Sequence, residues 1–229
     1  MHKIKSKYLL IIVLNICLTA IRAQSITEVE GGYELIAYTT EDGGVIEASY
    51  FEGGKDYVVI FAHGAVFNKE SWYFMAERLK KEGVSSLSID FRGYGNSKKG
   101  TTDNRSLDIL GAIDFLKEKG FGKIAIVGAS MGGAAVLNAL DAKTDPAINR
   151  VALLAPAGGV EIVTESIKKM FIVSKEERLF TTVNSIFDES AQPKELKVYP
   201  GSFHAQNMFK AEYGEELTNL IINFLITPK

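Results

Sequence analysis

The stretch that most constrains the fold of this chain runs from Lys123 to Leu140. It begins with an apolar run, rich in β-branched residues, that predicts a buried strand, and it ends in an Ala- and Leu-rich run that predicts a helix. Between them lies Gly128-Ala129-Ser130-Met131-Gly132, a G-x-S-x-G pattern whose small residues permit a sharp strand-to-helix turn. Because such a turn holds the serine hydroxyl clear of the sheet, Ser130 is the candidate nucleophile.

A second interpretation of the same pattern is purely structural. A glycine-rich turn also lets a helix pack closely on a strand, and the residues that follow, Gly133-Ala134-Ala135, have the size of packing residues. The position of the motif at a strand-to-helix junction favours the nucleophile. The two interpretations are compatible, and both stay open at this point.

Strand-like apolar runs alternate with helical patterns along most of the chain. The first two expected strands are separated by Glu41-Asp42-Gly43-Gly44, a turn signal that predicts an antiparallel hairpin at the sheet edge. Strands are expected at 33–40, 45–51, 56–62, 84–89, 123–127, 150–155, 170–174 and 195–199, and helices at 69–82, 103–119, 133–140, 177–189 and 205–226. The alternation predicts an α/β fold with a mostly parallel central sheet and helices on both faces.

The N-terminal segment has the features of a secretory signal peptide. Three lysines precede an apolar run from Tyr8 to Ala20, which is short for a membrane span, and Ala23 offers a small residue at a cleavage site. Residues 1–23 are therefore expected to be removed, leaving residues 24–229 as a single exported domain, periplasmic or secreted. An uncleaved membrane anchor is the alternative.

Removing this segment changes the composition in ways that exclude several classes of function. It holds four of the 26 basic residues and none of the 28 acidic ones, so the mature chain has a net charge of −6, which argues against a nucleic-acid partner. The only cysteine, Cys17, also lies there, so no disulfide and no cysteine nucleophile is expected. Two histidines remain, too few for a Cys/His metal site, and no cofactor is predicted.

A serine nucleophile needs a neighbouring base, and only two histidines can supply one. His63 ends an apolar strand and precedes a glycine, a position typical of a side chain that braces a loop. His204 closes Pro200-Gly201-Ser202-Phe203-His204, between the last strand and the last helix, where a loop can hold an imidazole over Ser130. We therefore predict His204 as the base, with an exposed loop histidine as the alternative.

The acid that orients the base is harder to place. Among the carboxylates between Ser130 and His204, only Glu176 and Glu177 follow directly on a buried strand. Glu177 is preferred, with Glu176 as the alternative. A third possibility is a solvated acidic pair, since Lys175 and Arg178 flank the two carboxylates.

The reaction also needs donors for the negatively charged oxygen of the intermediate, and these are usually backbone N–H groups. The turn supplies the N–H of Met131, directly after the serine. A second donor is expected from a loop after an earlier strand, where Ala65 follows His63 and Gly64.

Several motifs of the chain resemble those of the α/β-hydrolase fold superfamily, and the resemblance covers nearly all of residues 24–229. In that superfamily the catalytic order is nucleophile, acid, histidine, as in Ser130, Glu177 and His204, although most members have an aspartate where this chain has Glu177. The Arg-Gly-x-Gly-x-Ser loop is structural in the family, so no catalytic role is assigned to its arginine or serine. The matching motifs are His63-Gly64-Ala65, Ser71-Trp72, Asp90-Phe91-Arg92-Gly93-Tyr94-Gly95-Asn96-Ser97, the Ser130 turn and Pro200-Gly201-Ser202-Phe203-His204.

The resemblance implies a small serine hydrolase without a separate cap domain, because only residues 156–169 are available between two strands where relatives carry one. A serine at the turn argues against the dehalogenase and epoxide hydrolase branches, which attack with a carboxylate. The expected reaction is carboxylesterase-type hydrolysis of a small-molecule acyl substrate, an ester or else a thioester or amide, with no stable membrane insertion after signal removal. The candidate lining residues are Phe67, Tyr94, Met131 and Phe203, with simple packing as the alternative role. The alternative is a non-catalytic binding protein that retains the fold.

Overall fold

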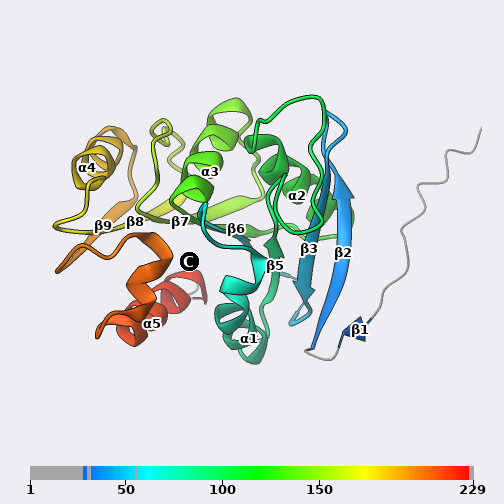
Figure 1. Cartoon of the computed structure of the whole chain (residues 1–229), viewed down its shortest axis with the longest axis horizontal. Coiled ribbons are helices and arrows are strands. Elements are labelled where there is room, and N and C mark those ends of the chain that lie inside the picture. Colours follow the sequence, from blue (N-terminus) through cyan, green and yellow to red (C-terminus); the bar gives the residue numbers. More distant parts are fainter. Residues whose placement is uncertain (1–27, 30–31, 55, 227–229) are drawn as a thin grey trace, which may run out of the picture.

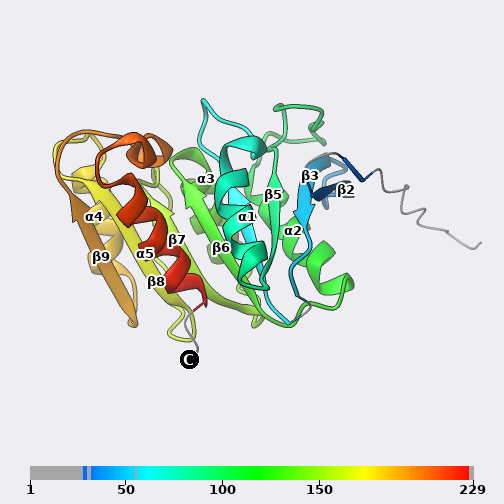
Figure 2. The same cartoon turned by 90° about the horizontal axis from the view of Figure 1, so that it is seen from below.

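A nine-stranded sheet runs through the protein and carries helices on both faces (Figures 1 and 2). The computed structural model describes residues 28–29, 32–54 and 56–226. The predicted signal peptide, residues 1–23, lies outside the described residues. The strands are β1 (Glu28–Val29), β2 (Tyr33–Thr39), β3 (Val45–Phe51), β4 (Val58–Ala62), β5 (Ser85–Ile89), β6 (Ile124–Ala129), β7 (Ile148–Leu154), β8 (Lys168–Ser174) and β9 (Lys194–Tyr199).

The sheet is antiparallel at one edge and parallel elsewhere. Its order is β1-β2-β3-β5-β4-β6-β7-β8-β9, and the pairs among the first four strands in this order are antiparallel. All pairs from β5 to β9 are parallel. This confirms the predicted fold class, including the antiparallel hairpin near the N-terminal edge.

Burial explains why the central strands read as continuous apolar runs. Every residue of β4 and β6 is buried, as expected for parallel strands covered by helices on both faces. The register pairs Ala62 of β4 with Gly128 of β6, and Ala129 of β6 with Leu154 of β7. The carboxyl ends of these three strands therefore lie side by side, at the edge where sheets of this kind hold their functional groups.

The helices form two layers. In Figure 1, α1 and α5 lie on one face of the sheet, and α2, α3 and α4 lie on the other; Figure 2 views the α1 and α5 side. The α-helices are α1 (Tyr73–Lys81), α2 (Ser106–Glu118), α3 (Met131–Ala142), α4 (Phe180–Glu189) and α5 (Gly214–Ile226), with 3-10 helices η1 (Lys69–Trp72) and η2 (Ala205–Lys210). None of the helices in the described residues is long and apolar enough to cross a bilayer.

The prediction of one continuous helix over residues 205–226 is wrong. The chain forms η2, breaks at Ala211, whose backbone is extended, and starts α5 only at Gly214. At Gly214 the backbone passes so close to Phe209 that a Cβ atom would collide with the Phe209 carbonyl oxygen. The helix expected over 177–189 likewise begins only at Phe180, which leaves Glu177 in a turn directly after β8.

The connection between β7 and β8 is short. Residues 155–167, all of them described, contain no helix. The carboxyl edge of the sheet is therefore not covered by a helix from this connection.

Candidate active site

Ser130 occupies a strained turn between β6 and α3. Its φ of 51° and ψ of −114° are rare for a residue with a side chain. Two hydrogen bonds hold the turn, because the Ser130 N–H donates to the Leu154 carbonyl (2.9 Å) and the Ser130 carbonyl accepts from the Ala157 N–H (3.0 Å). The neighbouring segments thus supply the interactions that keep the hydroxyl in this position.

The two glycines of the G-x-S-x-G pattern are needed for packing around this turn. A Cβ atom at Gly132 would collide with the Ala62 carbonyl oxygen at the end of β4, and one at Gly128 would lie 2.9 Å from the Cα atom of Gly133. The motif therefore both turns the chain and lets α3 approach the sheet, so the structural interpretation holds beside the chemical one.

The three predicted side chains Ser130, His204 and Glu177 form one hydrogen-bonded row. The Oγ atom of Ser130 lies 2.8 Å from Nε2 of His204, and Nδ1 of His204 lies 2.5 Å from Oε2 of Glu177. Because an ionised carboxylate only accepts hydrogen bonds, Nδ1 carries the proton and Nε2 is left to accept the serine O–H. The arrangement can remove the proton of the Ser130 hydroxyl.

The structure also separates the two adjacent glutamates. Glu177 is buried and its Oε1 atom accepts the N–H of Ser174 at 3.4 Å, while its other oxygen faces His204. Glu176 is exposed, and its backbone N–H donates to the Gly201 carbonyl. Of the two, only Glu177 contacts the imidazole.

The other histidine, His63, is fully buried and braces the loop after β4. Its Nδ1–H donates to the Gly64 carbonyl (2.8 Å), and its Nε2 atom accepts the N–H of Phe91 (3.2 Å), so the ring is held neutral in one tautomer. Burial lowers the pKa of His63, although Asp90 nearby favours the charged form. His63 therefore braces the loop after β4, as its place in the sequence predicts.

The two predicted backbone donors lie on different segments, Ala65 in the loop after β4 and Met131 at the start of α3. Among the described residues, neither the Ala65 N–H nor the Met131 N–H has a hydrogen-bond partner. The Tyr94 hydroxyl lies between these two residues, donating to the Ala65 carbonyl (3.0 Å) and lying 3.6 Å from the Met131 sulfur. Two unpaired donors thus lie beside the strained serine, as an oxyanion site requires.

Arg92 holds the loop that carries Tyr94. Its guanidinium is completely buried and binds Asp42 (Nη1–Oδ2 2.7 Å) and Asp108 (Nε–Oδ1 2.8 Å). These hydrogen bonds hold the pKa of Asp42 well below its usual range. Ser97 closes the loop, since its hydroxyl donates to the Asp90 carbonyl at 2.8 Å. Arg92 and Ser97 are structural here, as the resemblance implied.

Sequence reasoning missed one polar side chain of this region, Gln206. It is 4% exposed, accepts the Gly64 N–H at 2.7 Å and donates to the Ser71 hydroxyl at 2.6 Å. The only signal available in the sequence was its position two residues after His204. The predicted helix from residue 205 concealed that signal by making Gln206 an ordinary helix residue.

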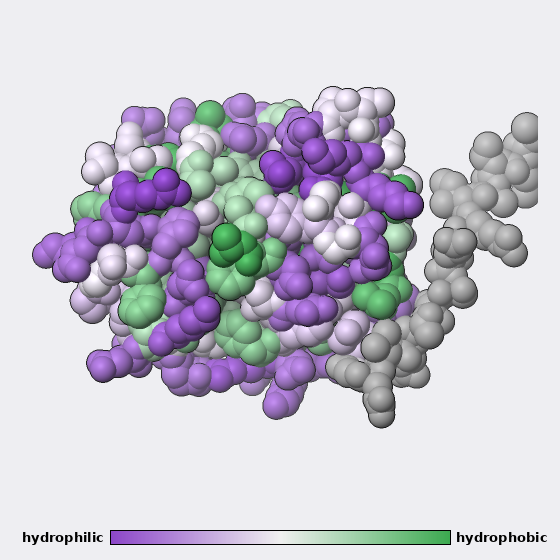
Figure 3. Space-filling view, viewed as in Figure 1, coloured by the Kyte–Doolittle hydropathy of each residue, from purple (hydrophilic) through white to green (hydrophobic). Residues whose placement is uncertain are grey.

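Apolar side chains on the loops that carry the Ser130–His204–Glu177 row and its donors are exposed. Val66, after β4, is 85% exposed, and Phe203, next to His204, is 45% exposed. The other expected lining residues, Phe67, Tyr94 and Met131, are half-buried. Figure 3, drawn in the view of Figure 1, shows apolar surface near the centre of the molecule, surrounded by hydrophilic residues. The surroundings of Ser130 thus offer contacts for an apolar substrate group.

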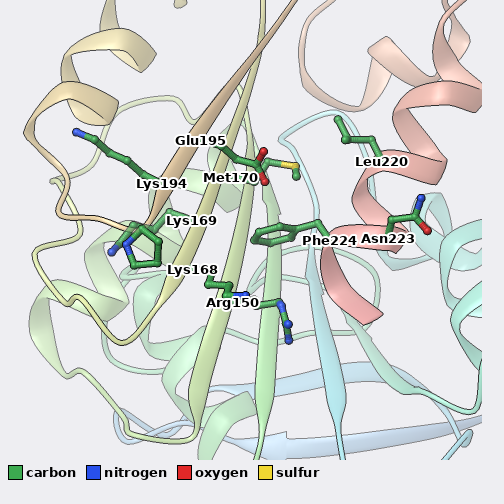
Figure 4. Close-up of a pocket in the computed structure, with 10 residues that line it drawn as sticks. Arg150, Lys168, Lys169, Met170, Lys194, Glu195, Leu220, Asn223 and Phe224 are labelled. Atoms are coloured by element: carbon green, nitrogen blue, oxygen red, sulfur yellow. The ribbon is translucent and has the colours of Figure 1, made fainter. Parts of the chain in front are cut away.

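A pocket of about 430 Å³ lies at the other end of the sheet, between the amino ends of β7, β8 and β9 and the end of α5 (Figure 4). Its lining includes Arg150, Lys168, Met170, Glu195 and Phe224. It is separated from Ser130 by the length of the strands. Neither this pocket nor any other part of the described chain gathers three or more residues of the types that bind a metal ion.

A comparison with protein-family models identifies the family of the central segment. The model described as "alpha/beta hydrolase fold" matches residues 57–187, more than half of the chain. The matched segment contains Ser130 and Glu177 and ends before His204.

Curated proteins with similar sequences include a hydrolase and an esterase/lipase. A 2-hydroxy-6-oxo-6-(2'-aminophenyl)hexa-2,4-dienoic acid hydrolase of Metapseudomonas resinovorans is 32% identical over 135 residues, which is 56% of this chain and 45% of that protein. A protein of Mycoplasma pneumoniae, provisionally named esterase/lipase 2, is 28% identical over 176 residues, 72% of this chain and 62% of that protein. The matched part of the chain thus spans about half of these relatives' lengths.

Solved structures share the fold. An esterase from Exiguobacterium antarcticum superposes with a TM-score of 0.69 at 16% identity and covers 82% of this chain and 98% of its own. An esterase from Pyrococcus furiosus gives a TM-score of 0.68 at 20% identity, with coverages of 84% and 90%. At these identities the likeness concerns the fold alone.

Proposed function

The chain belongs to the alpha/beta hydrolase fold family, and we propose that it is a serine hydrolase that cleaves carboxylic esters through an acyl-enzyme on Ser130. One observation supports this proposal above the others. Ser130, His204 and Glu177 form a hydrogen-bonded row beside two unpaired backbone N–H groups. This combination supplies a nucleophile, a base, an orienting acid and an oxyanion site in one place.

In the first half of the proposed reaction, Oγ of Ser130 attacks the ester carbonyl carbon while its proton passes to Nε2 of His204. Glu177 stabilises the resulting imidazolium through Nδ1, and the N–H groups of Ala65 and Met131 bind the carbonyl oxygen as it becomes negative. The intermediate collapses when the C–O bond to the leaving alcohol breaks and His204 returns its proton to that oxygen. The acyl group stays on Ser130.

In the second half, water takes the place of the alcohol. His204 accepts a proton from the water, whose oxygen attacks the acyl carbon, and the bond to Oγ then breaks as the proton returns to Ser130. The products are the free carboxylic acid and the regenerated serine. No group beyond the side chains already described is needed for the proton balance.

An ester is the proposed substrate class, with amides and thioesters as the alternatives. The exposed Val66 and Phe203 side chains suit an apolar acyl group, and the β7–β8 connection contributes no helix over the site. The relative from Mycoplasma pneumoniae and the two structures above are named as esterases. Amides need better protonation of a poorer leaving group, so a panel of chromogenic esters of increasing acyl length, with matched amides and thioesters, defines the substrate class.

An active-site probe tests the proposal directly. A fluorophosphonate is expected to label the wild-type protein at Ser130 with one probe per chain, and Ser130→Ala is expected to abolish both labelling and ester hydrolysis. The matched control is Ser202→Ala, an exposed loop serine near His204, which leaves labelling intact. A folded wild-type protein that takes up no probe and hydrolyses none of the panel would point instead to a binding protein that retains the fold.

We also propose that residues 1–23 direct export of the domain. Mass spectrometry of the protein recovered outside the cytoplasm is expected to find Gln24 at the N-terminus. Recovery of the intact chain in the membrane fraction would support the uncleaved anchor.

A further inference from the structure

We propose that Gln206 is a positioning residue that holds the loop of the oxyanion donor, Ala65, in place relative to the turn that carries the base, His204. The inference rests on the proposed function, because it concerns how Ala65 and His204 are placed relative to Ser130. Gln206 does not contact the reacting atoms. It acts through Gly64 on one side and through the backbone of residues 204–206 on the other.

The hydrogen bonds of Gln206 admit one assignment of its amide. A backbone N–H can only donate, so the atom that faces Gly64 at 2.7 Å is Oε1. Nε2 then faces Ser71, whose hydroxyl accepts at 2.6 Å while donating its own proton to the Asn68 carbonyl. The amide of Gln206 is thus fixed at both ends, and the side chain is shielded from water.

The hydrogen bond to Gly64 is one of three that hold successive peptide groups of the loop after β4. The peptide group between His63 and Gly64 is held by Gln206, the next is held by the His63 ring, and the third is held by the Tyr94 hydroxyl. In a planar trans peptide the C=O and the N–H point in opposite directions. Since His63 binds the Gly64 carbonyl, the Ala65 N–H of the same peptide group points the other way and is left unpaired. Gln206 controls the peptide group that precedes this donor.

The short connection between Gln206 and His204 makes the coupling tight. Ala205, between them, has a φ of 48°, a strained value for a residue with a side chain, and it is 2% exposed. Such a backbone persists only where surrounding contacts enforce it. The hydrogen bonds of Gln206 are anchors available for this purpose, so releasing them is expected to loosen the His204 turn and the Gly64 peptide together.

The space around Gly64 supports the positioning role of Gln206. A Cβ atom at Gly64 would lie 3.2 Å from Oε1 of Gln206 and 3.4 Å from Cβ of Ser130. The loop backbone at Gly64 therefore lies between the amide oxygen and the nucleophile with little free space on either side, so a displacement of the amide is passed to the loop beside Ser130. A misplacement of about 1 Å at a reacting group costs on the order of 10²-fold in rate.

The test compares Gln206→Met, which keeps the length of the side chain but removes both hydrogen bonds, with wild type. With the best chromogenic ester, kcat is expected to fall on the order of 10²-fold while KM changes less than about threefold, because the loss falls on the transition state. The Ki of a trifluoromethyl ketone, which forms a tetrahedral adduct on Ser130, is expected to rise in proportion to the loss in kcat/KM. A merely structural role would lower the stability of the protein but would leave kcat and this Ki of the folded protein unchanged.

Asn207→Ala is the matched control on the same 3-10 helix, since its side chain accepts a hydrogen bond from the exposed Lys210 ammonium and none from the described loop of Gly64. It is expected to keep wild-type kcat, KM and Ki. A folded Gln206→Met protein with wild-type kcat and Ki would overturn the inference while the proposed function stands. A wild type that shows neither turnover nor fluorophosphonate labelling would overturn both.

Ser71→Ala keeps the test decisive if Gln206→Met does not fold. It leaves the Gln206 side chain in place but removes the partner of its Nε2 atom. A fall in kcat of about tenfold with unchanged KM is expected, since the loosened amide holds Gly64 less well. Wild-type kcat and inhibitor affinity in this variant would overturn the inference.

Discussion

The Nδ1 atom of His204 lies 2.5 Å from Oε2 of Glu177, and the Glu177 side chain is 2% exposed while that of His204 is 32% exposed. The carboxylate thus contacts the imidazole from the protein interior, and the other ring nitrogen faces Ser130. A carboxylate shielded from water interacts more strongly with a developing imidazolium than one in solvent. The roles of the two adjacent glutamates are therefore expected to differ sharply.

Glu177→Gln removes the charge and keeps the shape of the side chain. We expect kcat for ester hydrolysis to fall on the order of 10³- to 10⁴-fold, because the amide neither stabilises the imidazolium nor enforces the tautomer that accepts the serine proton. Glu176→Gln, one residue earlier and exposed, is the matched control and is expected to keep nearly full activity. Steady-state kinetics of both variants measure the two losses in kcat. A larger loss in the Glu176 variant would make Glu176 the orienting acid.

His63 is expected to make the protein sensitive to acid. Burial lowers its pKa, so the unfolded chain binds the proton at a higher pH than the folded one. Stability contributed by neutral His63 is complete above its unfolded pKa of about 6.5 and is lost as pH falls from there toward the folded pKa, by up to about 1.4 kcal/mol per pH unit. Asp90 reduces the effect, while Arg105 and Lys69 add to it.

Urea unfolding of wild type and His63→Gln at pH 7.5, 6.5 and 5.5 isolates this contribution. The wild type is expected to lose more free energy of unfolding than the variant between pH 6.5 and 5.5. The difference in free energy of unfolding between the two proteins is therefore expected to become smaller in acid. All other titrating groups are present in both proteins. A gap that stays constant over this range would contradict a buried neutral His63.

Arg92 is expected to be essential for stability. Arg92→Lys keeps a positive charge but loses the planar fork that binds Asp42 and Asp108 simultaneously. The Oδ1 atom of the buried Asp108 loses its guanidinium donors, while Asp42 keeps only its hydrogen bonds from threonine residues. Breaking a buried pair typically costs about 3–5 kcal/mol. Arg78→Lys is the matched control, since the Arg78–Glu215 pair is exposed and its loss is expected to change the free energy of unfolding much less. Equal losses in urea unfolding would show that burial does not decide the effect.

The predictions that the structure confirms rest on local patterns. The apolar run before Ser130 and the small residues after it determine a strand, a turn and a helix through short-range sterics, and the glycines at 128 and 132 are there because a Cβ atom would clash. The alternation of strands and helices likewise predicts the parallel sheet. The prediction of a continuous helix from residue 205 is wrong because the backbone is extended at Ala211 and Gly214 packs against the Phe209 carbonyl, a break that the helical spacing of apolar residues does not reveal.

Other features depend on contacts between distant segments. Glu176 and Glu177 are adjacent, and the sequence leaves both open as the acid with a preference for Glu177; the turn after β8 exposes the first and buries the second against His204. Nothing in the sequence marks Gln206, because its role depends on Gly64, 142 positions earlier. A polar residue carries no periodic signal, so its function appears only when its partners are known.

By itself, the sequence determined the turn that exposes the Ser130 hydroxyl, since backbone sterics and strand propensity act within a few residues. Only the tertiary structure decided which groups surround that hydroxyl. His204 lies 74 positions from Ser130 along the chain, and the 2.8 Å between their side chains results from the order of strands in the sheet. That order depends on the burial of whole strands against helices, a long-range packing energy that no short segment encodes.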